Sequence, residues 1–199
     1  MQLPYIIISI AQFRPEKDHS LQISSFSKFL NSRNDKKNYK LMLVGSCRND
    51  GDSQRVEELK MLCSRLKVEK YVEFKLNISF DELKDLLSKS MIGIHTMWNE
   101  HFGIGVVELM AAGAVILAHN SGGPKLDIVT DFNQQKTGYL ADDIQSYAVA
   151  METIFNLTNK ERLVIKENAR QSVDRFSDEE FETGFLSVTE SILQKALAV

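Results

Sequence analysis

The sequence has little cysteine, little excess charge and no long apolar segment, and each scarcity excludes a class of protein. Its two cysteines, Cys47 and Cys63, are too few for the disulfide framework of a small secreted domain. The formal net charge of -3 provides no broad basic surface, so we expect no nucleic-acid partner and only local phosphate binding. No run approaches the roughly 18 apolar residues of a membrane-spanning helix, so we expect this chain by itself to be soluble.

The side chains that usually bind metals do not form a recognisable motif. The four histidines are His19, His95, His101 and His119. No two of them have the His-x-x-x-His spacing, the cysteines lack ligand spacing, and the carboxylates are not clustered with either. We therefore expect no metal ion and no other cofactor.

Short apolar runs of strand length alternate with longer segments of helical period. This alternation is typical of a parallel sheet covered by helices on both faces. We predict strands at residues 5–11, 40–44, 71–74, 91–96, 115–118 and 137–140. We predict helices near residues 21–30, 56–67, 79–88, 103–112, 143–157, 159–174 and 177–197. The expected fold is α/β, a Rossmann-like doubly wound parallel sheet with C-terminal helices, in one domain over residues 1–199.

Ligands of such sheets bind beyond the carboxyl ends of the strands. Polar and glycine residues gather in the loops expected there, at residues 12–19, 45–53, 97–102 and 119–124. The expected binding site therefore lies at this edge.

Two glycines stand where a helix is predicted to begin next to this edge. At Gly103 and Gly105, backbone N–H groups and the helix dipole favour an anion such as phosphate. Arg14 and Lys17, in the loop after the first strand, can bind the outer oxygens of a diphosphate from the same edge. Plainer interpretations stay open, because the glycines could serve close packing and Arg14–Lys17 could be a solvated turn.

Two carboxylates flank the same predicted helix start. Glu108 is the only charged residue between Phe102 and Ala118, so we expect it to be buried, and either ion-paired or bound to a ligand. A carboxylate that accepts two hydrogen bonds suits a vicinal diol such as a ribose. Glu100 could accept hydrogen bonds from sugar hydroxyls or stabilise positive charge at an anomeric carbon. Alternatively, Glu100 is a helix N-terminal acid that contributes about 0.3–1 kcal/mol.

Other residues near this edge have two interpretations each. Trp98 could form a wall of the pocket or pack in a core or interface. The turn Ser121-Gly-Gly-Pro124 could bring backbone close to a ligand or be an ordinary tight turn. His101 and His119 could donate hydrogen bonds into the pocket or have structural roles.

The motif Glu100-x7-Glu108, with Phe102-Gly103 inside it and Ala111-Ala-Gly113 after it, resembles the retaining GT-B glycosyltransferases of family four. The resemblance extends from the loop Pro15-Glu-Lys17 to the turn Gly122-Gly123. It implies the C-terminal, donor-binding half of a two-domain enzyme, with the N-terminal acceptor domain absent from this chain. One of the later helices would brace that other domain.

Longer matching stretches imply a particular chemistry within this family. Residues 12–17, 95–108 and 118–129 look like mannosyltransferases that use GDP-mannose as donor and a dolichol-pyrophosphate-linked oligosaccharide as acceptor. The resemblance implies transfer of an α-1,2-linked mannose at the cytosolic face of the endoplasmic reticulum membrane, in the synthesis of N-glycan precursors.

The resemblance also assigns roles to individual residues. Lys17 would contact the donor diphosphate, Glu100 the mannose and Glu108 the ribose. Gln12 stands where many family members have an arginine, and Arg14 is expected to take over its contact. The implied catalytic residues are Arg14, Lys17 and Glu100. The implied donor-binding residues are Arg14, Lys17, Gly45, Glu100, His101, Phe102, Gly103, Ile104, Gly105 and Glu108.

These roles leave the mechanism and two rival functions open. If Arg14, Lys17 and the helix N-terminus neutralise the departing GDP, no metal is needed. Glu100 is either a nucleophile or, as we favour, a positioning residue while the leaving phosphate deprotonates the acceptor. The rivals are a GT-B transferase for another nucleotide sugar, such as UDP-glucose, and a catalytically silent nucleotide-binding domain. We expect the isolated chain to bind GDP or GDP-mannose weakly and to turn over little.

Overall fold

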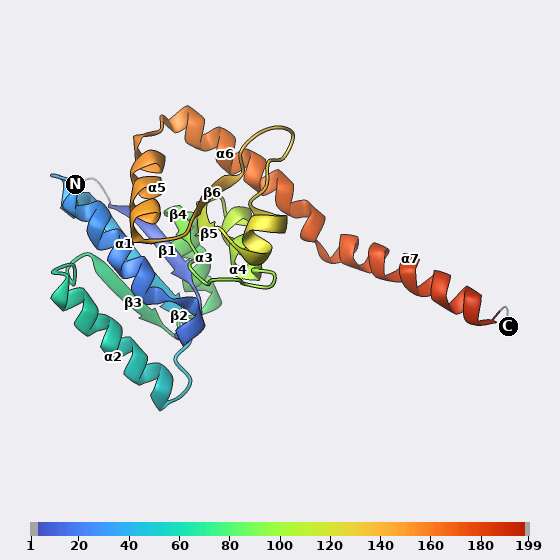
Figure 1. Ribbon diagram of the computed structural model, residues 1–199, viewed down its shortest axis with the longest axis horizontal. Coiled ribbons are helices and arrows are strands. Elements are labelled where there is room, and N and C mark those ends of the chain that lie inside the picture. The colour runs from blue at the N-terminus through green and yellow to red at the C-terminus, as the bar shows by residue number, and fades with distance from the viewer. Residues whose placement is uncertain (1–3, 198–199) are drawn as a thin grey trace.

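The computed structural model describes residues 4–197, with side chains to residue 190. Six parallel strands form one sheet in the order β3-β2-β1-β4-β5-β6 (Figure 1). The strands are β1 (Tyr5–Ile10), β2 (Tyr39–Gly45), β3 (Val72–Leu76), β4 (Ser90–Ile94), β5 (Val115–His119) and β6 (Gly138–Ala141). The predicted doubly wound parallel sheet is confirmed.

Within residues 4–197, seven α-helices connect and follow the strands. They are α1 (His19–Asn31), α2 (Asp50–Arg65), α3 (Phe80–Ser88), α4 (Ile104–Ala111), α5 (Ile144–Asn156), α6 (Asn159–Ser172) and α7 (Asp178–Leu197). Short 3₁₀ turns occupy Pro15–Lys17, Lys36–Asn38 and Val173–Phe176. Each predicted helix is present within a few residues, except that α2 begins earlier, where the Asn49 side chain caps it.

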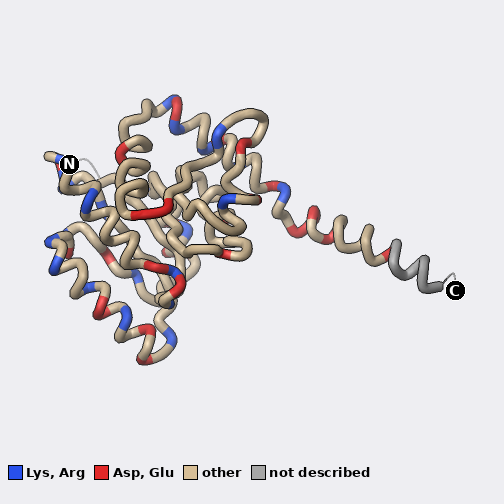
Figure 2. The backbone as a smooth tube through the Cα atoms, in the orientation of Figure 1, with Lys and Arg blue, Asp and Glu red and all other residues tan. Residues whose placement is uncertain are grey.

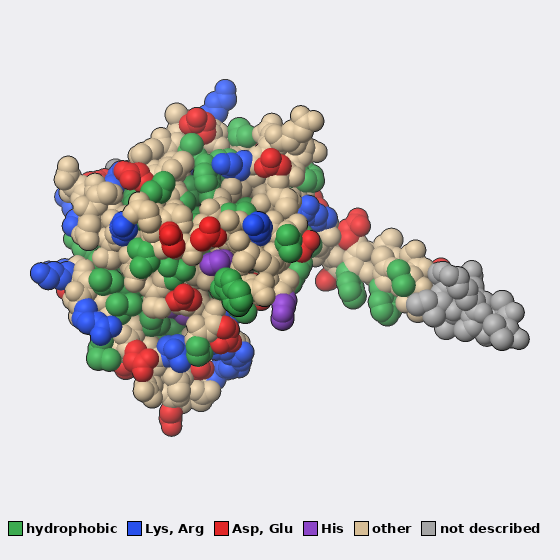
Figure 3. All heavy atoms as spheres, in the orientation of Figure 1, with side chains coloured by type: hydrophobic (Ala, Val, Ile, Leu, Met, Phe, Trp, Pro, Cys, Tyr) green, Lys and Arg blue, Asp and Glu red, His purple; other side chains and the backbone are tan. Residues whose placement is uncertain are grey.

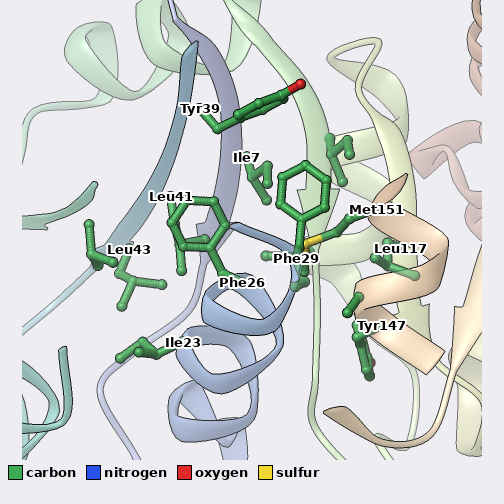
Figure 4. Close-up of a cluster of buried hydrophobic side chains, with 14 of the residues drawn as sticks. Ile7, Ile23, Phe26, Phe29, Tyr39, Leu41, Leu43, Leu117, Tyr147 and Met151 are labelled. Carbon is green, nitrogen blue, oxygen red and sulfur yellow. The ribbon is translucent and has the colours of Figure 1, made fainter. Parts of the chain in front are cut away.

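Successive side chains of each strand point to opposite faces of the sheet, so the core has two parts, one on each face. Ile7 of β1 lies beside Leu41 of β2 and Ile92 of β4, and this row packs against α1, α2 and α5 (Figure 4). Ile6 and Ile8 point to the opposite face, which α3 and α4 cover. The strands are apolar on both sides because helices bury both faces.

The segment after β5 differs from the sequence expectation. The turn that begins at Ser121 leads into a short π-helix, Pro124–Ile128, which the sequence did not predict. Ile128 is fully buried against the α4 side of the core, whereas Leu126 is exposed. Pro124 and Ile128 are the buried residues of this five-residue segment, which is too short to leave a periodic signal in the sequence.

The last helix projects away from the body of the molecule (Figure 1). Phe181, Phe185 and Val188 in the described part of α7 are exposed, and Figure 3 shows hydrophobic side chains on the surface of this part of the helix. Charges of both signs are distributed over the body (Figure 2). Among residues 4–197, no helix combines the length and apolar character needed to cross a bilayer.

Candidate functional site

The main candidate site is a cavity of about 580 Å³ at the carboxyl ends of β1 and β4. In the sheet, β1 lies between β2 and β4, and the strand order reverses between β1 and β4. The lining residues are Ile10, Ala11, Gln12, Lys17, His95, Glu100, His101, Phe102, Gly103, Ile104, Gly105 and Glu108.

Lys17 and Glu100 form an ion pair inside this cavity. The Lys17 Nζ lies 2.6 Å from Glu100 Oε2, and it also lies 3.1 Å from Met97 Sδ. The two charged side chains are about one-quarter and one-sixth exposed, respectively. Although burial works in the opposite direction, Lys17 and the other neighbours hold the pKa of Glu100 below its usual value. Sequence reasoning placed these residues on different parts of a ligand and did not foresee their direct contact.

Hydrogen bonds from two helices fix the strand end that carries this site. The Thr96 hydroxyl donates to the Lys17 carbonyl oxygen at 2.8 Å and accepts from the Gln22 side chain of α1 at 2.9 Å. On the other side, the buried Tyr147 hydroxyl of α5 donates to the His95 carbonyl oxygen at 2.7 Å. Lys17 and the start of the Glu100 loop therefore belong to one rigid unit.

The turn after β5 supports the Glu100 loop from behind. The Gly123 N–H donates to the Glu100 carbonyl oxygen at 2.7 Å. The Ser121 hydroxyl accepts from the Asn99 N–H at 2.7 Å and lies 2.8 Å from His119 Nδ1. His119 and this turn thus have a structural position in the described residues, and neither lines the cavity.

The first turn of α4 presents backbone donors to the cavity. Gly103 has a φ of +105°, a conformation that favours glycine, and no side chain caps the helix. Within the described residues, the N–H groups of Ile104 and Gly105 have no hydrogen-bond acceptor. An added Cβ at Gly105 would make only van der Waals contact, at 3.4 Å, with the Ile10 carbonyl oxygen. Packing alone therefore does not require glycine at position 105, and the geometry suits an anion.

Glu108 lines the cavity, but the expectation that it is buried is wrong. Glu108 is exposed, because it lies one helical turn after the exposed Ile104 on the outward face of α4. No cation within ion-pair distance of Glu108 occurs in the part of the chain that the structure describes. Nearby protein atoms partly desolvate the carboxylate and raise the pKa of Glu108. The internal ion pair considered from the sequence is absent from this part of the structure.

Three of the residues singled out from the sequence lie outside the cavity. The Arg14 side chain is 40% exposed and points to Glu16, with 3.9 Å between Nη1 and Oε1. Gly45 closely approaches β1, since an added Cβ would lie 1.9 Å from the Ala11 carbonyl oxygen. Trp98 is 72% exposed.

Gly45 does border a second, smaller recess of about 220 Å³. This recess shares Ile10, Ala11 and Gln12 with the main cavity and is mostly apolar. Its remaining lining residues are Val44, Gly45, Asn77, Ile78 and Leu83. The two hollows therefore adjoin along the end of β1.

His95 is a site residue that sequence reasoning did not assign to the pocket. Its Nε2 lies 3.5 Å from Glu100 Oε2, and its side chain is 7% exposed. Burial is the main cause that lowers the pKa of His95 to about 4, so the imidazole is neutral at pH 7. A polar residue at the first position beyond a buried strand was the available signal. In the described chain, no group of three or more His, Cys, Asp or Glu side chains is arranged to hold a metal ion.

A parallel sheet with unpaired helix N–H groups and two carboxylates beside a cavity at its switch point is an arrangement typical of domains that bind nucleotide sugars. The family model described as glycosyl transferases group 1 matches residues 2–172, and the chain belongs to this family. The resemblance noted in the sequence is confirmed at this level.

Curated relatives in several eukaryotes carry one name. The chain is 57% identical over 190 residues to a Xenopus laevis protein named GDP-Man:Man(3)GlcNAc(2)-PP-Dol alpha-1,2-mannosyltransferase, covering 94% of this chain and 39% of the relative. It is 53% identical to the Homo sapiens protein of that name, with 96% and 39% covered. The chain thus spans about two-fifths of the length of these relatives.

Solved structures support the fold independently. A glycosyltransferase from Rickettsia africae matches with a TM-score of 0.80 at 22% identity, over 97% of this chain and 48% of that one. Anabaena HepE, solved with UDP and glucose, matches with a TM-score of 0.74 at 19% identity, over 98% and 49%. At these identities, the comparison shows a shared fold that this chain matches with about half of each structure.

Proposed function

We propose that this chain is the donor-binding half of a retaining α-1,2-mannosyltransferase that uses GDP-mannose. The observation that carries the proposal is the convergence of Lys17, Glu100, Glu108 and the start of α4 on one cavity. The names of relatives at 53–58% identity give the donor and acceptor classes. The acceptor would be dolichol-pyrophosphate-linked Man3GlcNAc2 or Man4GlcNAc2, held mainly by an N-terminal domain outside this chain.

Each end of the donor has a counterpart in the cavity. The unpaired N–H groups at the start of α4 and the Lys17 ammonium suit the diphosphate. Glu108, on the next turn of α4, suits the ribose diol, and Glu100 would then contact the mannose. The adjoining apolar recess near Ile78 and Leu83 suits the flat face of a base.

The proposed reaction breaks the bond between the anomeric carbon of mannose and the diphosphate oxygen. The bonding electrons leave with GDP, while the acceptor hydroxyl oxygen forms the new bond on the same face of the sugar. The acceptor proton passes to the departing phosphate oxygen. Lys17 and the α4 N–H groups stabilise the charge on the leaving diphosphate, and Glu100 stabilises the positive charge that develops on the sugar. No metal ion or other cofactor takes part in this proposal.

The proposed location is the cytosolic face of the endoplasmic reticulum, where a dolichol-linked acceptor is embedded in the membrane. Membrane contact is assigned to the longer protein, since the relatives are about two and a half times as long as this chain. Nucleic acid has no part in this assignment.

The deciding experiment is calorimetric titration of this chain with GDP, UDP and ADP. We expect weak binding of GDP and weaker binding of the other two. Lys17→Ala should reduce the GDP affinity by about tenfold or more, because it removes a charge-assisted hydrogen bond. A preference for UDP would favour a transferase for another nucleotide sugar. If none of the three nucleotides bound, the proposed donor site would be contradicted.

A further inference from the structure

Lys17 cannot keep its present contact with Glu100 and also bind the diphosphate of the proposed donor. In the structure, the Lys17 ammonium is the cation that contacts Glu100, at 2.6 Å. A diphosphate bound at the start of α4 carries two or more negative charges and attracts the same ammonium. When Lys17 moves toward the diphosphate, Glu100 loses its main partner just when its orientation matters.

Among the described residues, His95 is the other side chain within ion-pair distance of Glu100, and it can replace that partner. Its Nε2 lies 3.5 Å from the same oxygen of Glu100, at the edge of hydrogen-bond distance. Its other ring nitrogen, Nδ1, is buried and has no partner among the described residues. A neutral imidazole donates from one nitrogen only, and the carboxylate acceptor at Nε2 favours the tautomer with its hydrogen there.

The backbone of His95 is held more firmly than a loop residue usually is. Its N–H donates to the Leu117 carbonyl oxygen of β5 at 3.0 Å, and its own carbonyl oxygen accepts from Tyr147. The imidazole therefore projects from a fixed point toward Glu100, whereas Lys17 is a long side chain that can turn to another anion.

We propose that His95 is a positioning residue that keeps Glu100 directed at the donor sugar when Lys17 binds the diphosphate. This inference rests on the proposed function, because it requires a nucleotide sugar in the cavity. It adds a residue to the site and predicts that the Lys17–Glu100 contact opens on donor binding. The group facing Glu100 from β4 is neutral, so it orients the carboxylate without competing with Lys17 as a second cation.

The test compares GDP with GDP-mannose on His95 variants of this chain. In the wild type, GDP-mannose should bind more tightly than GDP. We expect His95→Leu to keep the GDP affinity within about twofold and to lower the GDP-mannose affinity by about fivefold or more. His95→Gln retains an N–H donor and should recover most of that loss. In a Glu100→Ala background, His95→Leu should have no further effect, because its partner is already gone.

A measurement on the wild-type chain covers the case in which a variant does not fold. In nuclear magnetic resonance spectra of ¹⁵N-histidine-labelled chain, saturation with GDP should shift the His95 Nε2–H signal downfield as the bond to Glu100 shortens. An unchanged signal would overturn the positioning role. The same conclusion would follow if His95→Leu and His95→Gln each lowered the affinities for GDP and GDP-mannose by equal factors. GDP-mannose that binds no better than GDP would overturn that role too. Failure of GDP itself to bind would instead remove the proposed function.

Discussion

An added Cβ at Gly122 would stand 2.2 Å from the carbonyl oxygen of Glu100. Gly122 also has a φ of +55°, which side chains other than glycine rarely adopt. The turn after β5 and the loop that carries Glu100 can therefore approach this closely only because position 122 lacks a side chain. The neighbouring Gly123 N–H then completes the contact with its hydrogen bond to the same oxygen.

Gly122→Ala should therefore displace the Glu100 loop. We expect a loss of about 1–3 kcal/mol in the free energy of unfolding, from backbone strain and the clash, measured by urea denaturation. The affinity for GDP-mannose should fall as well. Gly184→Ala is a matched control, because an added Cβ there meets nothing within 4 Å. Equal unfolding midpoints for wild type and Gly122→Ala would contradict the close approach.

For Arg14, the family resemblance and the observed geometry predict different effects on nucleotide binding. The resemblance gives it a diphosphate contact, but its guanidinium points to Glu16 and does not line the cavity. We expect Arg14→Ala to change the GDP affinity of this chain by less than about twofold, in contrast to Lys17→Ala. Calorimetry on both variants checks this. A tenfold loss for Arg14→Ala would restore the role that the resemblance implies.

The fold was predictable from the sequence, whereas the arrangement within the site was predictable only in part. Apolar runs of strand length and apolar residues at helical spacing are local signals, so element order and sheet type followed from them. The Lys17–Glu100 contact joins residues 83 apart, and no local pattern encodes it. Glu108 was placed inside the protein because its neighbours are apolar, yet one outward-facing position in a helix keeps it exposed.

Glu108 should recognise the ribose rather than stabilise the fold. We expect Glu108→Gln to weaken GDP binding several-fold and to abolish the difference between GDP and 2′-deoxy-GDP, as calorimetry would show. Because partial desolvation raises the pKa of Glu108, its charged form is disfavoured in the folded state. The variant should therefore be at least as stable as the wild type at pH 7. A variant that still distinguishes the two nucleotides would contradict the ribose contact.

Acid sensitivity of the fold is predicted from a different histidine, His19 at the start of α1. Its ring stacks on Phe13 with 4.8 Å between centroids, and neither ring nitrogen has a hydrogen-bond partner in the described chain. Burial is the main cause that lowers the pKa of His19 from 6.5 to about 4. Between these values the unfolded chain binds a proton that the folded chain does not bind.

The stability from neutral His19 is therefore fully present above pH 6.5 and is lost as the pH falls toward 4, by about 3 kcal/mol in total. His95 contributes in the same direction, because its pKa is lowered too. His19→Leu should flatten the fall of unfolding free energy across this range, measured by urea denaturation at a series of pH values. The exposed His101 provides the control His101→Leu, which removes a histidine but leaves the buried His19 ring in place. If His19→Leu retained the full wild-type slope, the acid sensitivity would have to arise from other groups, with His95 the first to test by the same substitution.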